Sequence, residues 1–245
     1  MTESRTIGIV ATGAVLSLLM AAQTPLSVHE PDGSPKGGIV LVQEAFGVND
    51  HIEDVGRRFA AEGWLTVAPH LFHRSGDPTF GYDDMSVVMP HMQALTAEGV
   101  MADIDAALDE LQGRGIPPER IGVVGFCMGG TVTLVTAARR PVGAAVTFYG
   151  GGVTEGRFGF PPLVEEAALL RAPWLGLYGD LDEGIPVDAV ERLREAAAAS
   201  GQTTEIVRYP EAGHGFHCDQ RGSFEAKSAE DAWARTQAWF NEHLT

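Results

Sequence analysis

The chain has 245 residues, of which 44% are hydrophobic, and its 33 acidic and 17 basic residues give a formal net charge of −16 at pH 7. Because no basic run interrupts this acidity, we expect no nucleic-acid partner. The length suits one domain with a single buried core. The two cysteines, Cys127 and Cys218, make no disulfide framework, which indicates a reducing compartment.

The amino-terminal segment is mostly apolar. Residues 7–22 carry no charge and resemble the apolar region of a signal peptide, but no clean small-x-small cleavage site follows them. The stretch is also shorter than the roughly 20 apolar residues that span a membrane. We therefore expect residues 1–22 to be an extension, with Met20 as an alternative start, and residues 23–245 to form a single domain. The expected location is cytoplasmic, without a membrane partner, or exported if residues 7–22 act as a signal.

Continuous apolar runs recur along the rest of the chain. Such runs predict strands that are buried on both faces of a parallel sheet, and they fall at 38–42, 65–68, 121–125, 144–148, 174–178 and 205–208. Helical patterns lie between them at 51–61, 97–112, 128–139, 187–199 and 224–244. This alternation predicts an α/β fold with a mostly parallel open sheet and helices on both faces.

Residues 75–95 do not follow the alternation of strands and helices. Two glycines and two prolines interrupt a series of apolar side chains there, from Phe80 to Met89. We expect this irregular segment to cover the site as a mobile apolar lid. An ordered loop that fills a surface groove is the alternative.

The sequence G-F-C-M-G-G at residues 125–130 directly follows an apolar run. It has the form G-x-C-x-G, the sharp strand-to-helix turn called a nucleophile elbow, with a thiol where serine is usual. The glycines leave room for the reversal on either side of Cys127. The partial positive charge at the start of the next helix favours a thiolate. A buried structural cysteine is the alternative interpretation.

An acid and a base follow Cys127 in the order that a hydrolytic triad of this kind has. Asp180 and Asp182 lie in the loop after the fifth predicted strand, and His214 lies in the loop after the sixth. Because the carboxyl ends of parallel strands meet at one edge of the sheet, these side chains are expected to lie near Cys127. A lone histidine before a glycine is more often a loop residue, but the ordered set of three indicates a triad.

The chain resembles the dienelactone hydrolase family, whose carboxymethylenebutenolidase-like members have the α/β-hydrolase fold. The resemblance is carried by Q-E-A-F-G-V-N at 43–49, A-P-H-L-F-H-R at 68–74, the elbow, the acid loop at 179–186 and A-G-H-G-F at 212–216. These motifs span nearly the whole chain. The Q-E-x-F-G motif together with the cysteine elbow is specific to the family rather than generic to the fold.

The resemblance implies a role for each matched residue. Cys127 is the nucleophile and His214 the base, and Asp182 is the acid because the family's acid stands three places after the glycine that begins the loop. In the family, the glutamate that matches Glu44 contacts the thiol in the resting enzyme and helps to control its ionisation. An exposed carboxylate at a strand end is the alternative for Glu44.

The same resemblance implies the groups that contact the substrate. The backbone N–H groups of Ala45 and Met128 form an oxyanion hole, and Arg74 matches an arginine that helps to bind a substrate carboxylate. A second family arginine lies four places after the histidine, where this chain has Cys218. Arg221 could substitute for it only if the loop bends suitably, so strict dienelactone specificity does not follow.

The expected reaction is cysteine-dependent hydrolysis of a small-molecule ester or lactone through a thioester on Cys127. A thiolate is also a good leaving group, so activated esters, enol lactones and thioesters suit it better than amides. Tyr149, which follows the strand at 144–148, is expected in the pocket wall. The alternatives are a broad carboxylesterase or thioesterase, a non-catalytic ligand-binding protein and a redox-sensing thiol.

No metal or other cofactor is expected. The pairs His70/His73 and His214/His217 have the three-residue offset of some metal ligands, but neither pair has a convincing third ligand nearby in the sequence. The sequence is compatible with a monomer or a small homo-oligomer.

Overall fold

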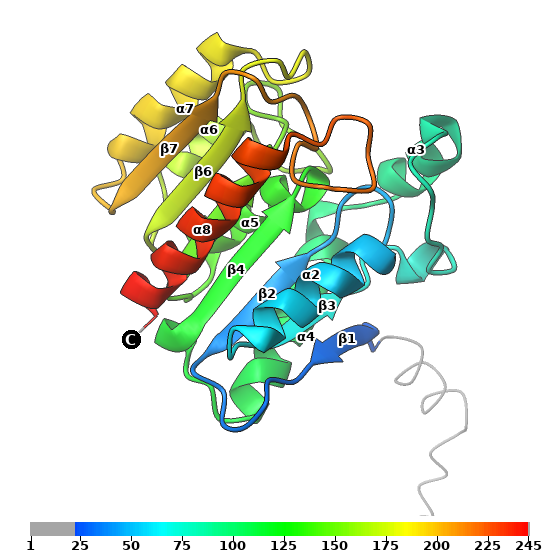
Figure 1. Ribbon diagram of the computed structural model, residues 1–245, viewed down its shortest axis with the longest axis vertical. Coiled ribbons are helices and arrows are strands. Elements are labelled where there is room, and N and C mark those ends of the chain that lie inside the picture. The colour runs from blue at the N-terminus through cyan, green and yellow to red at the C-terminus, as the bar shows by residue number, and fades with distance from the viewer. Residues whose placement is uncertain (1–22, 245) are drawn as a thin grey trace, which may run out of the picture.

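The computed structural model describes residues 23–244, so the expectations for residues 1–22 lie outside the described part. Seven strands form one sheet (Figure 1). In sheet order they are β1 (Leu26–His29), β3 (Leu65–Pro69), β2 (Gly38–Val42), β4 (Ile121–Phe126), β5 (Ala144–Phe148), β6 (Trp174–Gly179) and β7 (Thr204–Tyr209). β1 pairs antiparallel with β3, and the other neighbours are parallel.

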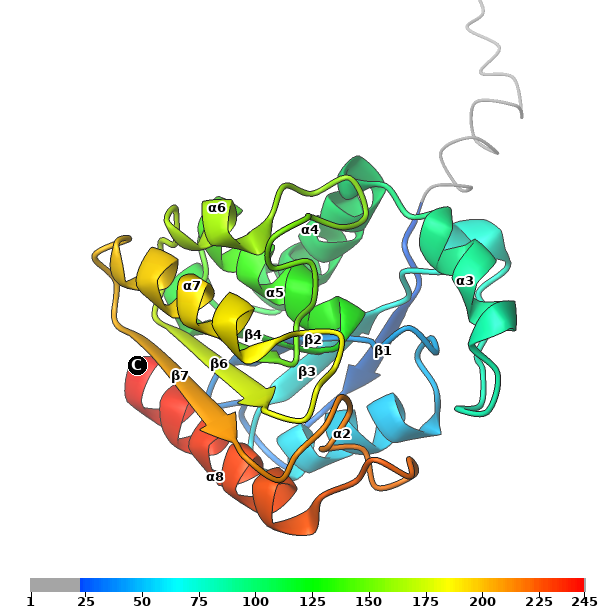
Figure 2. The ribbon, with the colours of Figure 1, turned by 90° about the horizontal axis from the view of Figure 1, so that it is seen from above.

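Helices cover both faces of this sheet (Figure 2). On one face lie α2 (Asp50–Ala61) and α8 (Ala226–His243), and on the other lie α4 (Ala97–Gly113), α5 (Met128–Arg139), α6 (Leu163–Ala167) and α7 (Val187–Ala198). The short 3-10 helices η1 (His73–Ser75) and η2 (Pro118–Arg120) lie in connections. The predicted architecture is therefore confirmed. Within residues 23–244, no helix is both long enough and apolar enough to cross a membrane.

The predicted strands match β2 to β7, with ends that differ by at most one residue. Every residue of β2 to β6 is buried, which explains why their sequences are continuous apolar runs. β1 was not predicted from the sequence. It is a four-residue edge strand, half-buried throughout, and its polar Ser27 and His29 alternate with apolar neighbours.

A helix replaces part of the irregular segment that the sequence predicted at 75–95. This helix, α3 (Met85–Gln93), stands apart from the sheet (Figure 1). Asp84 caps it, because its side chain accepts a hydrogen bond from the Ser86 N–H at 2.8 Å. Pro90 lies inside this helix. Because proline lacks the N–H that an internal helical position normally uses, the sequence did not indicate a helix here.

The carboxyl edge of the sheet collects the candidate residues. Glu44 follows β2, Cys127 follows β4, Tyr149 follows β5, Asp182 lies after β6 and His214 lies after β7. Because these strands are parallel neighbours, their carboxyl ends bring residues that are distant in sequence to one side of the molecule.

Glycines allow the turn after β4 to pack closely against its neighbours. A Cβ on Gly125 would lie 2.3 Å from the carbonyl oxygen of Gly129, and a Cβ on Gly129 would lie 2.3 Å from that of Val42. At Gly130 the distance to the Phe148 carbonyl oxygen would be 2.6 Å. A methyl group therefore has no room at any of the three positions.

We expect Gly129→Ala to lower the free energy of unfolding by about 3 kcal/mol, because the new methyl meets backbone carbonyls rather than a movable side chain. Gly113→Ala is the matched control, since Gly113 ends α4 and a Cβ there meets no heavy atom within 4 Å. The control should be neutral or stabilising by up to about 1 kcal/mol. Urea unfolding followed by circular dichroism measures both. Equal stability of the two variants would contradict the steric argument.

Candidate active site

Cys127 occupies the turn between β4 and α5 in a strained backbone conformation. Its φ of 55° and ψ of −114° lie outside the regions that residues with a Cβ prefer. Its N–H donates to the Phe148 carbonyl at 3.0 Å, which joins the turn to the end of β5. The side chain is partly exposed and lines a cavity. The turn thus presents the thiol to this cavity at the amino end of α5.

His214 and Asp182 are hydrogen-bonded to one another. His214 Nδ1–H donates to Asp182 Oδ2 at 2.6 Å, and the Gly184 N–H donates to the other carboxylate oxygen at 2.9 Å. Asp180 is bound elsewhere, by the Arg208 guanidinium at 2.7 and 2.8 Å. Of the two aspartates in this loop, Asp182 is therefore the one that contacts the histidine.

The charge state of His214 depends on Cys127 and Asp182. Burial alone would lower the pKa of His214, but the charge of the Cys127 thiolate and the hydrogen bond to Asp182 outweigh burial and raise this pKa to about 10. A thiolate next to an imidazolium is the pair that a cysteine nucleophile needs. Cys127, Asp182 and His214 all line the same cavity.

Two backbone N–H groups beside Glu44 and Cys127 in the sequence, those of Ala45 and Met128, have no acceptor among residues 23–244. Ala45 lines the cavity with Cys127, and among residues 23–244 its N–H donates to no acceptor. Met128 is the first residue of α5, where an N–H has no partner within the helix. Both groups that the resemblance implied are thus available for a substrate oxygen.

Glu44 lies in a buried layer beside the cavity. Its side chain is 1% exposed, Tyr149 donates its hydroxyl to Oε1 at 3.3 Å, and Arg221 Nη1 lies 3.5 Å from the same oxygen. Burial raises the pKa of Glu44 by more than Arg221, His214 and Tyr149 lower it. Among residues 23–244, no hydrogen bond joins Glu44 to Cys127, so the implied contact with the thiol is not formed by a hydrogen bond.

The loop after β7 bends enough for Arg221 to reach Glu44. The guanidinium carbon of Arg221 lies 5.4 Å from the ring centre of Phe46 and 5.5 Å from that of Tyr82. Cys218 is fully buried and contacts the Tyr82 hydroxyl. Arg221 therefore pairs with Glu44, but it does not line the cavity.

Two residues expected to contact the substrate have other partners. Arg74 binds the fully buried Asp103 carboxylate through two hydrogen bonds of 2.7 and 3.0 Å, and it does not line the cavity. Tyr149 is also absent from the cavity lining, and its ring packs edge-on against His214 with centroids 5.1 Å apart. The structure thus brings Tyr149 to His214 but does not bring Arg74 to the cavity.

The cavity itself has a volume of about 800 Å³. The apolar side chains in its lining include Met85, Met89, Met92, Leu95, Phe158 and Leu181. Arg157 also lines it, and this arginine forms no ion pair among residues 23–244. Sequence analysis missed Arg157. The only sequence signal was its position in the glycine-rich loop that follows β5.

The histidines at positions 70, 73 and 217 are engaged away from the cavity. His70 contacts the Asp77 carboxylate at 2.7 Å and His73 contacts the Asp103 carboxylate at 3.1 Å, so these two histidines do not share a partner. His217 is buried among aromatic rings, and burial lowers its pKa to about 3. It is therefore neutral at physiological pH.

Comparisons with known proteins show which family the chain belongs to. The model of the dienelactone hydrolase family matches residues 26–244. A protein from Methylorubrum extorquens named "Putative carboxymethylenebutenolidase" is 43% identical over 215 residues, which cover 86% of this chain and 74% of that protein. A protein of the same name from Escherichia coli strain K12 is 40% identical over 217 residues, with coverages of 87% and 79%.

Solved structures show the same similarity. The crystal structure of a "Putative Dienelactone Hydrolase" from Klebsiella pneumoniae superimposes with a TM-score of 0.83 at 40% identity, covering 89% of this chain and 93% of that one. An α/β hydrolase from a deep-sea metagenome shares the fold with a TM-score of 0.68 at 14% identity. The chain therefore belongs to the dienelactone hydrolase family and is a hydrolase of ester or lactone bonds.

Proposed function

We propose that the chain hydrolyses a small ester or enol lactone through a triad of Cys127, His214 and Asp182. One observation carries this proposal. His214 is hydrogen-bonded to Asp182 at 2.6 Å in the cavity that Cys127 lines, and the Cys127 thiolate contributes to its raised pKa. The family model supports the reaction class, and the geometry supports these three residues as its agents.

The first half of the reaction transfers the acyl group to sulfur. The Cys127 thiolate attacks the carbonyl carbon, and the oxygen that becomes negative accepts hydrogen bonds from the N–H groups of Ala45 and Met128. When the tetrahedral intermediate collapses, the bond to the alkoxide or enolate breaks and the His214 imidazolium gives that leaving group a proton. A thioester remains on Cys127.

The second half of the reaction releases the acid. Neutral His214 takes a proton from a water molecule, whose oxygen attacks the thioester carbonyl, and the Cys127 thiolate then leaves. Asp182 keeps Nδ1 of the imidazole protonated and in place, so Nε2 is the atom that transfers protons. The Gly184 N–H fixes the Asp182 carboxylate in turn.

The cavity supports a substrate that is small and largely apolar. Its volume of about 800 Å³ lies in the range typical of small-molecule sites. Met85 and Met89 of α3 line the cavity although they are 44% and 41% exposed, so the helix forms an outer wall of the cavity. Only Val88 and Met92 of this helix are buried. This placement supports a lid role for α3, because a helix with few buried contacts can open at low cost.

A broad carboxylesterase is the second candidate, and the positions of two arginines favour it. Arg74 is held by Asp103 and Arg221 by Glu44, so neither of the arginines considered for a substrate carboxylate lines the cavity. Hydrolysis of neutral p-nitrophenyl esters beside a dienelactone separates the two candidates. A clear preference for the dienelactone would exclude the broader activity.

Trapping the acyl-enzyme tests the proposed mechanism. A slow activated ester should add one acyl group to the protein, detected by intact-mass spectrometry, and peptide mapping should place it on Cys127. Cys218 is an internal control because it is fully buried and should remain unmodified. Turnover without any adduct on Cys127, under conditions in which deacylation is rate-limiting, would contradict a thioester intermediate.

Arg157 should set a preference for anionic esters. We expect Arg157→Gln to lower kcat/KM about three- to tenfold for an ester that carries a carboxylate in its acyl part, since an exposed charge pair is worth roughly 1 kcal/mol. A neutral ester of the same size should be unaffected. Arg192→Gln is the matched control, because Arg192 is an exposed residue of α7 that is absent from the cavity lining. Equal losses for both esters would assign Arg157 a structural role instead.

A further inference from the structure

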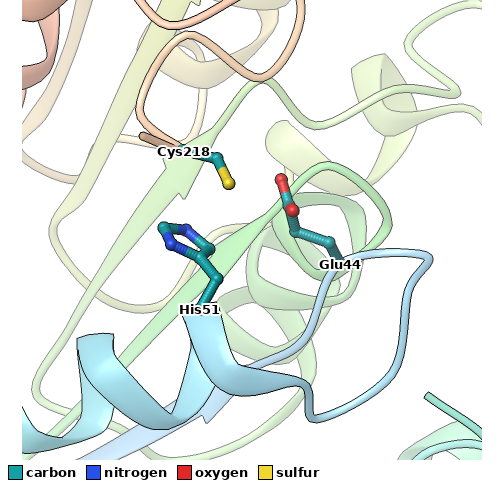
Figure 3. A group of neighbouring side chains, drawn as sticks. All are labelled: Glu44, His51 and Cys218. Carbon is teal, nitrogen blue, oxygen red and sulfur yellow. The ribbon is translucent and has the colours of Figure 1, made fainter. Parts of the chain in front are cut away.

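Glu44, His51 and Cys218 form a buried cluster of possible metal ligands (Figure 3). Glu44 follows β2, His51 belongs to the first turn of α2, and Cys218 lies in the loop between β7 and α8. Their side chains are at most 1% exposed. One ligand atom of each, an imidazole nitrogen, a sulfur and a carboxylate oxygen, lies within 4.8 Å of the other two.

Three polar atoms of this cluster lack a hydrogen-bond partner in the described part of the chain, whereas the Cys218 thiol contacts the Tyr82 hydroxyl. Among residues 23–244, neither ring nitrogen of His51 has a hydrogen-bond partner, and Oε2 of Glu44 has none either. The other oxygen of Glu44 already contacts Tyr149 and Arg221. Burying polar atoms without partners is unfavourable, and an ion bound by all three side chains would satisfy these atoms together.

We propose that Glu44, His51 and Cys218 bind a zinc ion. Thiolate, imidazole and carboxylate are the ligands that zinc takes in proteins, and the sulfur makes magnesium or calcium a poor fit. Ligand atoms around one tetrahedral zinc lie roughly 3.5 Å apart, so the most distant pair must approach by about 1 Å. Binding removes the proton of the Cys218 thiol, which passes to the buffer, and no oxidation or reduction takes place.

The charged residues around the cluster set its properties. Asp219 Oδ1 lies 3.8 Å from Nδ1 of His51, which is too long for a hydrogen bond. A small approach would let this carboxylate accept from Nδ1–H and leave Nε2 as the ligand. The Arg221 guanidinium beside Glu44 opposes a second cation, so we expect weaker binding than at a structural zinc site. The ion would connect the loop that carries Ala45 with the loop that follows His214. We therefore expect metal binding to affect the positions of Ala45 and His214 although the ion does not contact the substrate.

Cobalt substitution tests the site without relying on activity. The chain has two cysteines, Cys127 and Cys218, and residues 1–22 contain neither cysteine nor histidine. The Cys127→Ala protein therefore retains Cys218 as its single thiol. We expect this protein to bind one Co²⁺ and to show a thiolate-to-cobalt charge-transfer absorption. The absorption should disappear when Zn²⁺ displaces the cobalt. The protein should also unfold at a higher temperature when Zn²⁺ is present.

Variants in the same Cys127→Ala background assign the ligands. Adding His51→Gln should remove the absorption or weaken cobalt binding at least tenfold, whereas adding His91→Gln should leave both unchanged, because His91 lies on α3 outside the cluster. The Cys127→Ala protein still has all three proposed ligands. If it shows no charge-transfer absorption, the proposal is therefore wrong. Equal cobalt binding in the His51→Gln and His91→Gln proteins would overturn it as well.

Discussion

Cys127→Ala is expected to lower kcat/KM for an activated ester by about 10⁴-fold or more, since the variant has no atom to form the acyl intermediate. The residual activity would come from the oxyanion donors and from substrate binding alone. Initial rates with a p-nitrophenyl ester, measured at concentrations well below KM, give the ratio directly.

Cys127→Ser is the matched control for this loss. Serine is nearly isosteric and keeps a potential nucleophile, but a hydroxyl ionises far less readily than a thiol, so we expect activity between that of alanine and that of cysteine. Thermal unfolding of the three proteins checks that the turn is intact. Hydrolysis by the alanine variant at the rate of the unchanged protein would mean that the activity does not depend on this sulfur.

Asp182→Asn is expected to lower kcat by roughly 10³- to 10⁴-fold. The amide keeps the shape of the carboxylate but cannot stabilise an imidazolium, and its NH₂ can face His214 Nδ1 and favour the wrong tautomer. Because the charge on Asp182 contributes to the raised pKa of His214, the variant should also lower that pKa. Nuclear magnetic resonance titration of the His214 ring protons measures this shift independently of the rate.

Asp180→Asn separates the effect of charge from the effect of position. Asp180 lies two residues away in the same loop and is bound by Arg208 rather than by His214. This variant should lose little stability, because the ion pair is partly exposed, and it should keep its kcat. Comparable losses of kcat in the two asparagine variants would mean that the loop, and not the Asp182 carboxylate, supports catalysis.

The parts of the site that could be predicted are those that depend on residues close together in the sequence. The elbow at Cys127 needs glycines at fixed offsets, and β4 before it is a continuous apolar run, so both signals lie within ten residues. Asp182 and His214 each follow a strand of the same kind. Parallel topology then brings these loops to one edge, which is why a local pattern predicted a distant contact.

Contacts that depend on loop shape could not be predicted in this way. Nothing in the sequence indicates that Arg74 is held by Asp103, or that the loop after β7 brings Arg221 to Glu44. Arg157 reaches the cavity because of backbone turns in a glycine-rich loop, which carry no periodic signal.

The sequence alone also did not suggest a metal site. Expectations about metals depended on histidines three residues apart, whereas Glu44, His51 and Cys218 come from three segments that only the folded chain brings together. Two ligands a few residues apart are a common sequence signal of a metal site. When each ligand comes from a different segment, the sequence contains no such characteristic spacing.

The left-handed backbone of Cys127 places catalysis and conformational stability in opposition at one position. A φ of 55° costs a residue with a Cβ on the order of 1 kcal/mol, whereas glycine adopts it freely. The proposed mechanism needs a thiol side chain there, although a smaller residue would suit the bend better. Any redesign of this chain for heat resistance that scores folding alone would favour removing the nucleophile that we propose.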